Sequence, residues 1–404
     1  MPFQIALSGL NSANSDLDIT ANNIANVNTT GFKRSRGNFA ELFATGLQSV
    51  SSQASGLGSR LATVQQEFSQ GSIDFTSSNL DLAIVGDGFF TLSGGGELSY
   101  SRAGAFQVDR DGFIVNSGGR RLQVYPATAN GFNTGTLSDL QLSNADNPPG
   151  ATTTVDSALN LPADAQPPAV TPVDPADPDS FNHSTSLTVF DSLGAEHQAT
   201  YYFAKTANPN EWEASLYIDG TAVGTAQTLA FDANGALTTP AAGEITFPAF
   251  TPGNGADDIT LTTDFSDVTQ FGDQFAVSNL TQDGFANGRL TGIEISDEGI
   301  VFARFTNGQS EALGKVALAN FANPQGLENL GDTEFGETFD SGQAQLGEAG
   351  TSNFGVLQSG ALEASNVDLT AELVNMITAQ RNFQANAQMI STADQIAQTV
   401  INIR

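Results

Sequence analysis

The sequence predicts a multidomain α+β protein in which N- and C-terminal helices form a coiled-coil-like inner domain. Two mainly β domains are expected between these helices, one inserted into the other. Three observations carry this prediction: heptad spacing of apolar residues at the two chain ends, strand-like alternation in the middle, and an uneven distribution of charge over the 404 residues. A chain of this length is expected to form several domains.

Charge separates the ends of the chain from its middle. The net charge is −30, yet residues 1–70 hold four basic and four acidic residues, and residues 360–404 hold two and four. Neutral ends are expected if they pack against other chains while the acidic middle faces water; an acidic surface that only aids solubility is the alternative. This charge argues against nucleic acid or an anionic membrane as a partner.

Composition argues against catalysis and against a cofactor. The chain contains no Cys and only two His residues, His183 and His197, so thiol chemistry, thiolate metal sites and a histidine-based zinc site are not expected. No phosphate-binding loop, nucleophile elbow or Ser/His/Asp arrangement is recognisable. Residues 1–30 lack the pattern of a cleaved signal peptide, and no apolar stretch reaches membrane-spanning length, so we expect neither a cleaved leader nor membrane insertion.

Residues 1–34 are predicted to supply the N-terminal helix of the inner domain. Phe3, Leu10, Leu17 and Ile24 are spaced seven apart, and Ala6 and Ala13 follow the first two by three. This repeat is typical of a helix that packs along one seam. The helix is expected to stop before Gly31, among Asn and Thr residues that bond their own backbone.

Residues 360–404 are predicted to supply the C-terminal helix. Residues 365–404 contain no Gly or Pro, and Asp368 is suited to capping the first turn. The apolar seam is expected to include Leu369, Leu373, Met376, Phe383, Ile390 and Ile401.

The two predicted seams need partners. They could zip together as an antiparallel coiled coil or pack against copies in neighbouring chains, and a pair of core helices in a monomer is the alternative. Both segments are rich in Asn, Gln, Ser and Thr and poor in the Glu/Lys pairs that cover a solvated helix. This composition favours packing among many identical helices.

Between the helices the pattern changes to that of strands. Residues 35–70 are predicted to be a connector, with a short helical piece at 39–43 and a Ser/Gly/Gln-rich loop at 49–59. Residues 71–145 are expected to form the first part of a β-domain, with strands near 82–92, 106–115 and 121–125. Asp109–Gly112 is interpreted as a plain turn and not as part of a calcium loop, because the regularly spaced ligands of such a loop are missing. Residues 285–359 are predicted to return to the same β-domain.

Residues 146–284 are predicted to be the inserted outer β-domain. Eight of the 15 prolines lie in residues 146–180, so this stretch is expected to be an extended surface segment. Strands are expected at 186–190, 198–204, 212–218 and 259–263, with Trp212 as a core anchor. Hinges are expected where segments join, near residues 70–71, 144–150 and 284.

Two motifs carry a resemblance to a known family. Residues 21–33 read ANNIANVNTTGFK, and residues 380–386 read QRNFQAN. Together with Arg102–Phe106 (RAGAF), they resemble the signatures of the bacterial flagellar axial proteins, the rod and hook family. The residues that match these signatures are Asn22, Asn23, Asn26, Asn28, Gly31, Phe32, Gln380 and Arg381.

The resemblance implies a structural subunit that assembles into a helical homopolymer. Rod proteins have a much shorter insertion, so residues 146–284 favour a hook subunit, which would form a curved hollow tube that transmits torque from rod to filament as a flexible universal joint. The implied localisation is the flagellar hook and basal body outside the cell, after export without a cleaved signal peptide. The implied partners are other copies of the chain, the distal rod, the hook-capping protein, the hook–filament junction proteins and the flagellar export apparatus.

Two other functions remain open at this point. A distal-rod protein would share both terminal motifs. A secreted β-rich surface or glycan-binding protein would explain the β-domains, but it would not explain why heptad helices bracket them.

Overall fold

The structure is a computed structural model that describes residues 2–42, 56–129, 131–142, 146–351 and 353–402. The chain forms two compact units. The first comprises residues 1–143, 292–304 and 310–404, and the second comprises residues 144–291 and 305–309. The insert predicted at residues 146–284 lies within the second unit, which extends beyond it on both sides. Both chain ends belong to the first unit.

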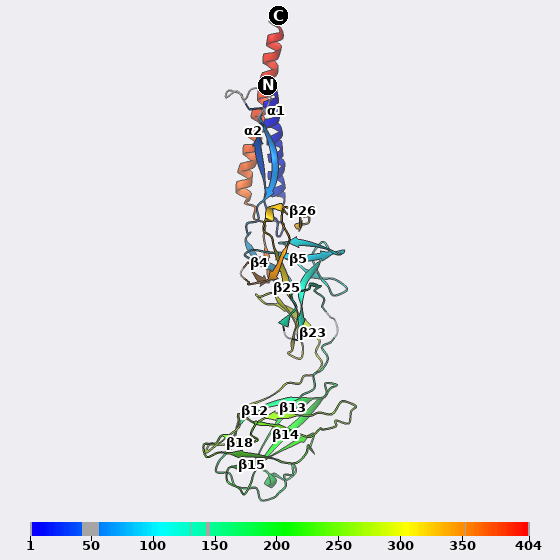
Figure 1. Cartoon of the computed structure of the whole chain (residues 1–404), viewed down its shortest axis with the longest axis vertical. Coiled ribbons are helices and arrows are strands. Elements are labelled where there is room, and N and C mark those ends of the chain that lie inside the picture. The colour runs from blue at the N-terminus through cyan, green and yellow to red at the C-terminus, as the bar shows by residue number, and fades with distance from the viewer. Residues whose placement is uncertain (1, 43–55, 130, 143–145, 352, 403–404) are drawn as a thin grey trace. The chain divides into compact units, whose positions relative to one another are not determined.

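Two long helices lie side by side in the first unit. Helix α1 (Pro2–Ala25) and helix α2 (Leu369–Asn402) run antiparallel, as their colours in Figure 1 show. Asp368 caps α2 as predicted, because its Oδ1 accepts hydrogen bonds from the amides of Thr370 and Ala371 at 2.8 and 3.1 Å. The described helices include none that is both long and apolar enough to cross a membrane.

A β-hairpin packs against α1 where a connector was predicted. Strands β1 (Ser35–Glu41) and β2 (Ser59–Gln66) pair antiparallel, with a register shift after Asn38. A Cβ added at Gly37 would lie 3.0 Å from Cδ1 of Ile19, so the hairpin lies directly on the helix. The prediction of a short helix at residues 39–43 is wrong, because residues 39–41 belong to strand β1. Phe43 and most of the loop predicted at residues 49–59 lie outside the described residues.

The rest of the first unit is a β-body built from both halves of the chain. Its strands from the first half are β3 (Ile73–Phe75), β4 (Leu82–Val85), β5 (Phe89–Gly94), β6 (Glu97–Ser101), β7 (Gln107–Val108), β8 (Ile114–Val115), β9 (Arg121–Thr128), β10 (Gly131–Phe132) and β11 (Ser138–Asp139). Those from the second half are β23 (Leu290–Ile295), β24 (Ile300–Phe305), β25 (Ser310–Asn320), β26 (Glu328–Gly331), β27 (Glu334–Gly336), β28 (Gln345–Glu348), β29 (Val356–Ser359) and β30 (Ala361–Glu363).

The pairing of these strands explains why the two halves form one body. The main sheet has the order β23-β24-β25-β9-β5-β6-β27-β26, so strands of the second half flank strands of the first on both sides. Phe90, Leu122 and Val316 are fully buried or nearly so in its core. The turn at residues 109–112 is a plain turn, as predicted: Oδ1 of Asp109 accepts bonds from the amides of Asp111 and Phe113.

The second unit is a β-sandwich. One sheet contains β19 (Glu244–Thr246), β20 (Thr262–Asp264), β12 (Thr154–Pro162), β21 (Thr269–Phe271) and β22 (Ala276–Gln282). The other contains β13 (His183–Phe190), β14 (Glu196–Lys205), β15 (Glu211–Ile218), β16 (Thr221–Ala222), β17 (Gln227–Phe231) and β18 (Leu237–Thr239). Trp212, fully buried among residues of both sheets, anchors the core as predicted.

The proline-rich stretch differs from its prediction. Residues 154–162 form β12, which pairs with β20, β21 and β22 and buries Val155, Leu159 and Leu161. The extended surface segment therefore begins only after Pro162. The prolines misled the prediction because they flank the strand and only one lies in it, at its last position.

The fold class is confirmed. Helices at the two ends bracket a mainly β middle, and a second β unit interrupts the first.

Candidate self-assembly site

Small residues are the most deeply buried apolar side chains of α1 and α2. Ala6, Ala13 and Ala379 are almost completely buried. Gly9 lies against Asn386, because a Cβ added there would be 2.6 Å from Oδ1 of Asn386. The backbones thus approach closely here, and Met376, Phe383 and Ile390 lie on the same heptad-spaced face of α2 as Ala379 and Asn386.

The structure leaves the large seam residues partly open. Phe3, Leu369 and Leu373 are 52%, 44% and 45% exposed. Leu10, Leu17, Ile24, Met376, Phe383 and Ile390 are half-buried, and the side chain of Ile401 lies outside the described residues. Apolar side chains in this state are suited to burial against other chains.

An apolar groove marks the end of this pair where α1 begins. It is lined by Phe3 and by residues of α2 that include Met389 and Ile396, with a volume of about 720 Å³. Met389 and Ile396 are 49% and 60% exposed. The apolar face of α2 therefore continues past the first turn of α1.

The signature residue Asn23 ties α1 to the hairpin. Its Nδ2 donates to the carbonyl of Ser35 at 2.8 Å, and its Oδ1 accepts from the amide of Ser35 at 2.9 Å. Asn23 is 1% exposed, so only a side chain with both a donor and an acceptor satisfies this buried position.

Gly31 is required where the chain leaves α1. Its φ is +68°, and an added Cβ would lie 2.4 Å from the backbone nitrogen of Ala103. Its amide donates to the carbonyl of Glu363 at 2.8 Å. Gly31 therefore joins three segments: the end of α1, the RAGAF segment and the strand before α2.

Beside Gly31 lies a buried charged junction formed by Lys33, Arg102 and Glu363. Lys33 Nζ is 2.6 Å from Glu363 Oε1, and both side chains are completely buried. Arg102 Nη1 is 3.3 Å from Glu363 Oε2. Burial lowers the pKa of Lys33 and of Arg102, while the Glu363 carboxylate opposes both shifts.

The junction reaches α2 through two further residues. Asn366 accepts a bond from the amide of Arg34 at 2.7 Å and donates to the carbonyl of Glu67 at 2.8 Å. Arg34 Nε is 3.1 Å from Oε1 of the buried Glu372 on α2. The start of α2, the end of α1 and the connector are thus fixed to one another.

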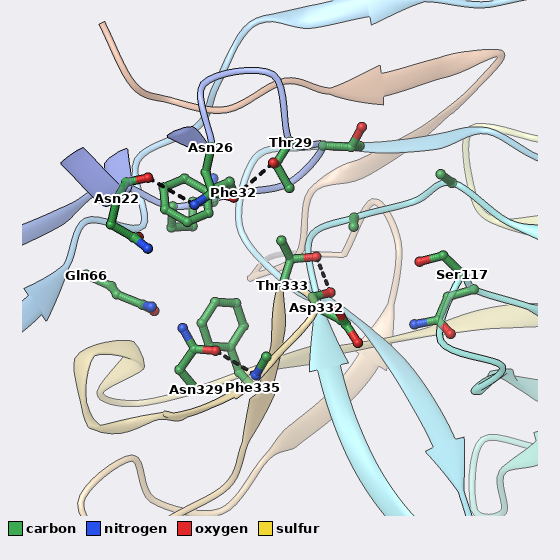
Figure 2. Close-up of a pocket in the computed structure, with 16 residues that line it drawn as sticks. Asn22, Asn26, Thr29, Phe32, Gln66, Ser117, Asn329, Asp332, Thr333 and Phe335 are labelled. Carbon is green, nitrogen blue, oxygen red and sulfur yellow. Dashed lines mark hydrogen bonds between the residues drawn. The ribbon is translucent and has the colours of Figure 1, made fainter. Parts of the chain in front are cut away.

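Other signature residues line a polar pocket of about 500 Å³ beside the junction. Figure 2 shows Asn22, Asn26 and Phe32 on one side of it and Asn329 and Thr333 on the other. Asn26 Nδ2 donates to the carbonyl of Asn22, and Thr29 donates to Oδ1 of Asn26. These bonds stop α1 and shape the rim.

The remaining signature residues are on the surface. Asn28, Gln380 and Arg381 are exposed. The structure therefore places Asn22, Asn26 and Phe32 around one pocket, Asn23 against the hairpin and Gly31 against the RAGAF segment. The other three are apart from them. Across the described ranges there is no group of three or more His, Asp or Glu residues placed to hold a metal ion.

Sequence reasoning missed the charged junction. Lys33 was visible in the motif GFK and Arg102 in RAGAF, but a charge beside a helix end is usually solvated. The sequence did contain a signal that these two cations are buried, because both lie within recognisable motifs and not in a charged stretch.

Known families match successive parts of the chain. Residues 3–33 match the family described as flagella basal body rod protein, and residues 358–403 match the flagellar basal body rod FlgEFG protein C-terminal family. Residues 83–171 match the flagellar hook protein FlgE/F/G D1 domain, and residues 160–285 match the flagellar basal body protein FlaE D2 domain.

Full-length relatives decide the family. The flagellar hook protein FlgE of Escherichia coli (strain K12) is 41% identical over 418 residues, which cover 100% of both chains. This chain belongs to the flagellar hook protein FlgE family. FlgE of Salmonella typhimurium is 39% identical over 419 residues, again covering 100% of both chains, and FlgE of Borreliella burgdorferi is 34% identical over 435 residues, covering 98% of each.

A solved structure supports the fold. The crystal structure of Helicobacter pylori flagellar hook protein FlgE2 has a TM-score of 0.54 and 15% identity, and the alignment covers 72% of this hook-family chain and 100% of that chain.

Proposed function

We propose that this hook-family chain polymerises through α1 and α2 into a curved hollow tube, the flagellar hook, which transmits torque from the rod to the filament as a flexible universal joint. The full-length identity to FlgE proteins carries the proposal. It favours a hook subunit over a distal-rod protein and over a secreted β-rich surface or glycan-binding protein.

The open helix faces support assembly between copies. Phe3, Leu373 and Ile396 are each more than two-fifths exposed, on helices that already contact each other. Burying apolar surface contributes about 25 cal/mol per Å², so many such helices packed side by side would be stabilised. The two seams thus serve as the proposed polymerisation surface, with Leu10, Leu17, Ile24, Leu369, Met376, Phe383, Ile390 and Ile401 as further members.

The acidic β units suit the outside of such a tube. Residues 71–359 carry almost all of the net charge of −30. Like-charged surfaces stay hydrated and slide on small, wet contacts, which a joint that lengthens and shortens with each turn requires.

Further partners and the localisation belong to the same proposal. We infer contacts with the distal rod, the hook-capping protein and the hook–filament junction proteins, after passage through the flagellar export apparatus without cleavage of a signal peptide. The proposed role is structural, without catalysis and without a cofactor.

The test is electron microscopy of the purified full-length chain below and above its assembly concentration. The unchanged chain is expected to form curved hollow tubes. Leu17→Asp and Phe383→Asp place a charge in the packed helix layer and are expected to stop polymerisation while the β units stay folded. Leu193→Asp, at an exposed apolar residue of the second unit, is the matched control. Normal tubes from Leu17→Asp and Phe383→Asp would contradict the assigned seam.

A further inference from the structure

Arg381 is an exposed cation whose side chain faces away from α1. It follows the buried Glu372 by nine residues, which is about two and a half turns of an α-helix and therefore the opposite side of α2. No ion pair or hydrogen bond within the described part of the chain involves its side chain. Among residues 369–402 it is the one basic residue.

Asp18 is likewise an exposed charged residue, on α1. It is exposed, and it accepts one hydrogen bond, from Asn14 one turn earlier at 3.2 Å. Asp16 is the other charged residue of α1, and it lies half-buried on a different side of the helix. Each helix thus presents one charge on its open face, and the two charges have opposite sign.

We propose that Asp18 of one copy pairs with Arg381 of a neighbouring copy, and that this pair sets the register in which the open face of α1 packs on the open face of a neighbour's α2. The inference rests on the proposed function and names the contact through which copies assemble. In a helical polymer every copy has the same polarity along the axis, so α1 of one copy runs antiparallel to α2 of the next.

The register is specific because it also matches the neighbouring residues. In an antiparallel pair, facing residue numbers have a constant sum, and pairing 18 with 381 brings 3 opposite 396 and 25 opposite 374. Phe3, Ile396 and Val374 are 52%, 60% and 58% exposed, and Ala25 is exposed as well. Apolar residues therefore meet at both ends of the contact, and the charges meet between them.

The same register also places polar residues opposite polar residues. Asn11 would face Gln388, and both are exposed. Asn11, Asp18, Val374 and Arg381 lie outside the groove that Phe3, Gln388 and Ile396 line within one copy, so at that end a neighbour's helix would fill the groove.

The register differs from that within one copy by a defined step. Within the chain Gly9 faces Asn386, which places Asp18 level with Ile377, four residues from Arg381. Four residues correspond to about 6 Å along a helix. Neighbouring copies would therefore be displaced axially by about this amount, as a helical assembly requires.

Charge reversal tests the pair. Asp18→Arg and Arg381→Asp are each expected to raise the critical concentration for polymerisation of the full-length chain at least about tenfold, because attraction becomes repulsion. The double variant is expected to restore it to within about threefold. Arg110→Asp, at a 92% exposed arginine side chain of the β-body, is the control, and far-UV circular dichroism of each monomer checks folding.

Cysteine cross-linking tests the register independently of charge, because the chain contains no Cys. A copolymer of an Asn11→Cys chain and a Gln388→Cys chain is expected to give covalent dimers on oxidation. Asn11→Cys mixed with Thr370→Cys, about 27 Å further along α2, is expected to give none.

The outcomes separate this inference from the proposed function. Tubes formed as readily by both single reversals, or a double variant no better than either single, would overturn the pair, as would equal cross-linking in the two mixtures. Absence of any polymer from the unchanged chain would overturn the proposed function and the inference together.

Discussion

At the scale of single residues, His197 is held between two carboxylates of the second unit. Its Nδ1 is 2.6 Å from Oδ2 of Asp219, and its Nε2 is 3.3 Å from Oδ2 of the buried Asp191. Burial by itself lowers the pKa of His197, but the bonds to Asp219 and Asp191 outweigh it and raise the pKa above its usual value. The imidazolium thus links the turns that follow β13 and β15.

This arrangement predicts how the stability of the second unit depends on pH. Because the folded pKa of His197 is raised, its contribution is fully present below the unfolded pKa of about 6.5 and is lost as the pH rises through the folded value. His197→Gln is expected to remove this loss of stability at high pH. Thermal unfolding followed by the fluorescence of Trp212, the one Trp of the chain, measures it.

His183 provides the matched contrast. Burial lowers the pKa of His183, so its contribution has the opposite sign and is lost as the pH falls through the folded value. His183→Gln should therefore leave the alkaline loss unchanged. An alkaline loss of the same size in His197→Gln would contradict the assignment to His197.

At the scale of elements, the charged junction fixes the geometry of the first unit. Glu363 lies at the end of β30 and accepts bonds from Lys33, Arg102 and the amide of Gly71. These residues come from the segment between α1 and β1, the β-body and the segment after the hairpin. One carboxylate therefore holds together elements that the sequence separates by hundreds of residues.

Glu363→Gln tests this role. The substitution keeps the shape but leaves two buried cations without a counter-charge, so the free energy of unfolding of the first unit is expected to fall by about 3–5 kcal/mol. Urea unfolding followed by hydrogen exchange of first-unit amides measures it. The Trp212 transition of the second unit and the exposed control Glu328→Gln are expected to be unchanged. An unchanged first-unit transition in Glu363→Gln would show that the junction is not stabilising.

The elements also show what could be predicted from sequence. Both helices, the cap at Asp368 and longer strands such as β9, β14 and β15 follow from local periodicity and turn residues, whereas β6, β12 and β17 were not among the predicted strands. The hairpin was missed because β1 is polar, and residues 39–43 resemble a helical turn. A hinge expected at residues 70–71 is not favoured, since Gln70 bonds to Ile84 and Gly86, and Gly71 bonds to Glu363.

The candidate site was predictable only in part. Heptad spacing located the faces of α1 and α2, but it cannot tell which members touch within one copy. Ala6, Ala13 and Ala379 are almost completely buried, because small residues let the helices approach closely. The large members are half-buried or exposed within one copy, a distribution that depends on tertiary packing.

At the scale of the whole molecule, the first and last residues of the inserted segment pair with each other as two short antiparallel stretches. Asn147 and Gly288 exchange hydrogen bonds at 2.7 and 3.1 Å, and Gly150 and Phe285 do so at 3.0 and 2.9 Å. Everything between residues 150 and 285 therefore departs from and returns to one antiparallel ladder. The helices proposed to build the polymer belong to the other unit.

This organisation predicts that the insert can be removed without loss of assembly. Replacing residues 151–284 by Asn-Gly would close the ladder with a two-residue hairpin turn, which suits paired strands. The shortened chain is expected to polymerise, because α1, α2 and the junction are intact. Its tubes are expected to be straighter, because contacts made by the second unit no longer favour a curved form.

Electron microscopy of the shortened and full-length chains measures both assembly and curvature. A control that replaces only residues 163–178 by a short Gly/Ser linker removes the segment after β12 and keeps the sandwich strands, so its tubes are expected to remain curved. A shortened chain that stays monomeric, although its first unit is folded, would show that the second unit takes part in assembly itself. Curvature equal to that of the full-length tube would instead place its origin in the helices and the β-body.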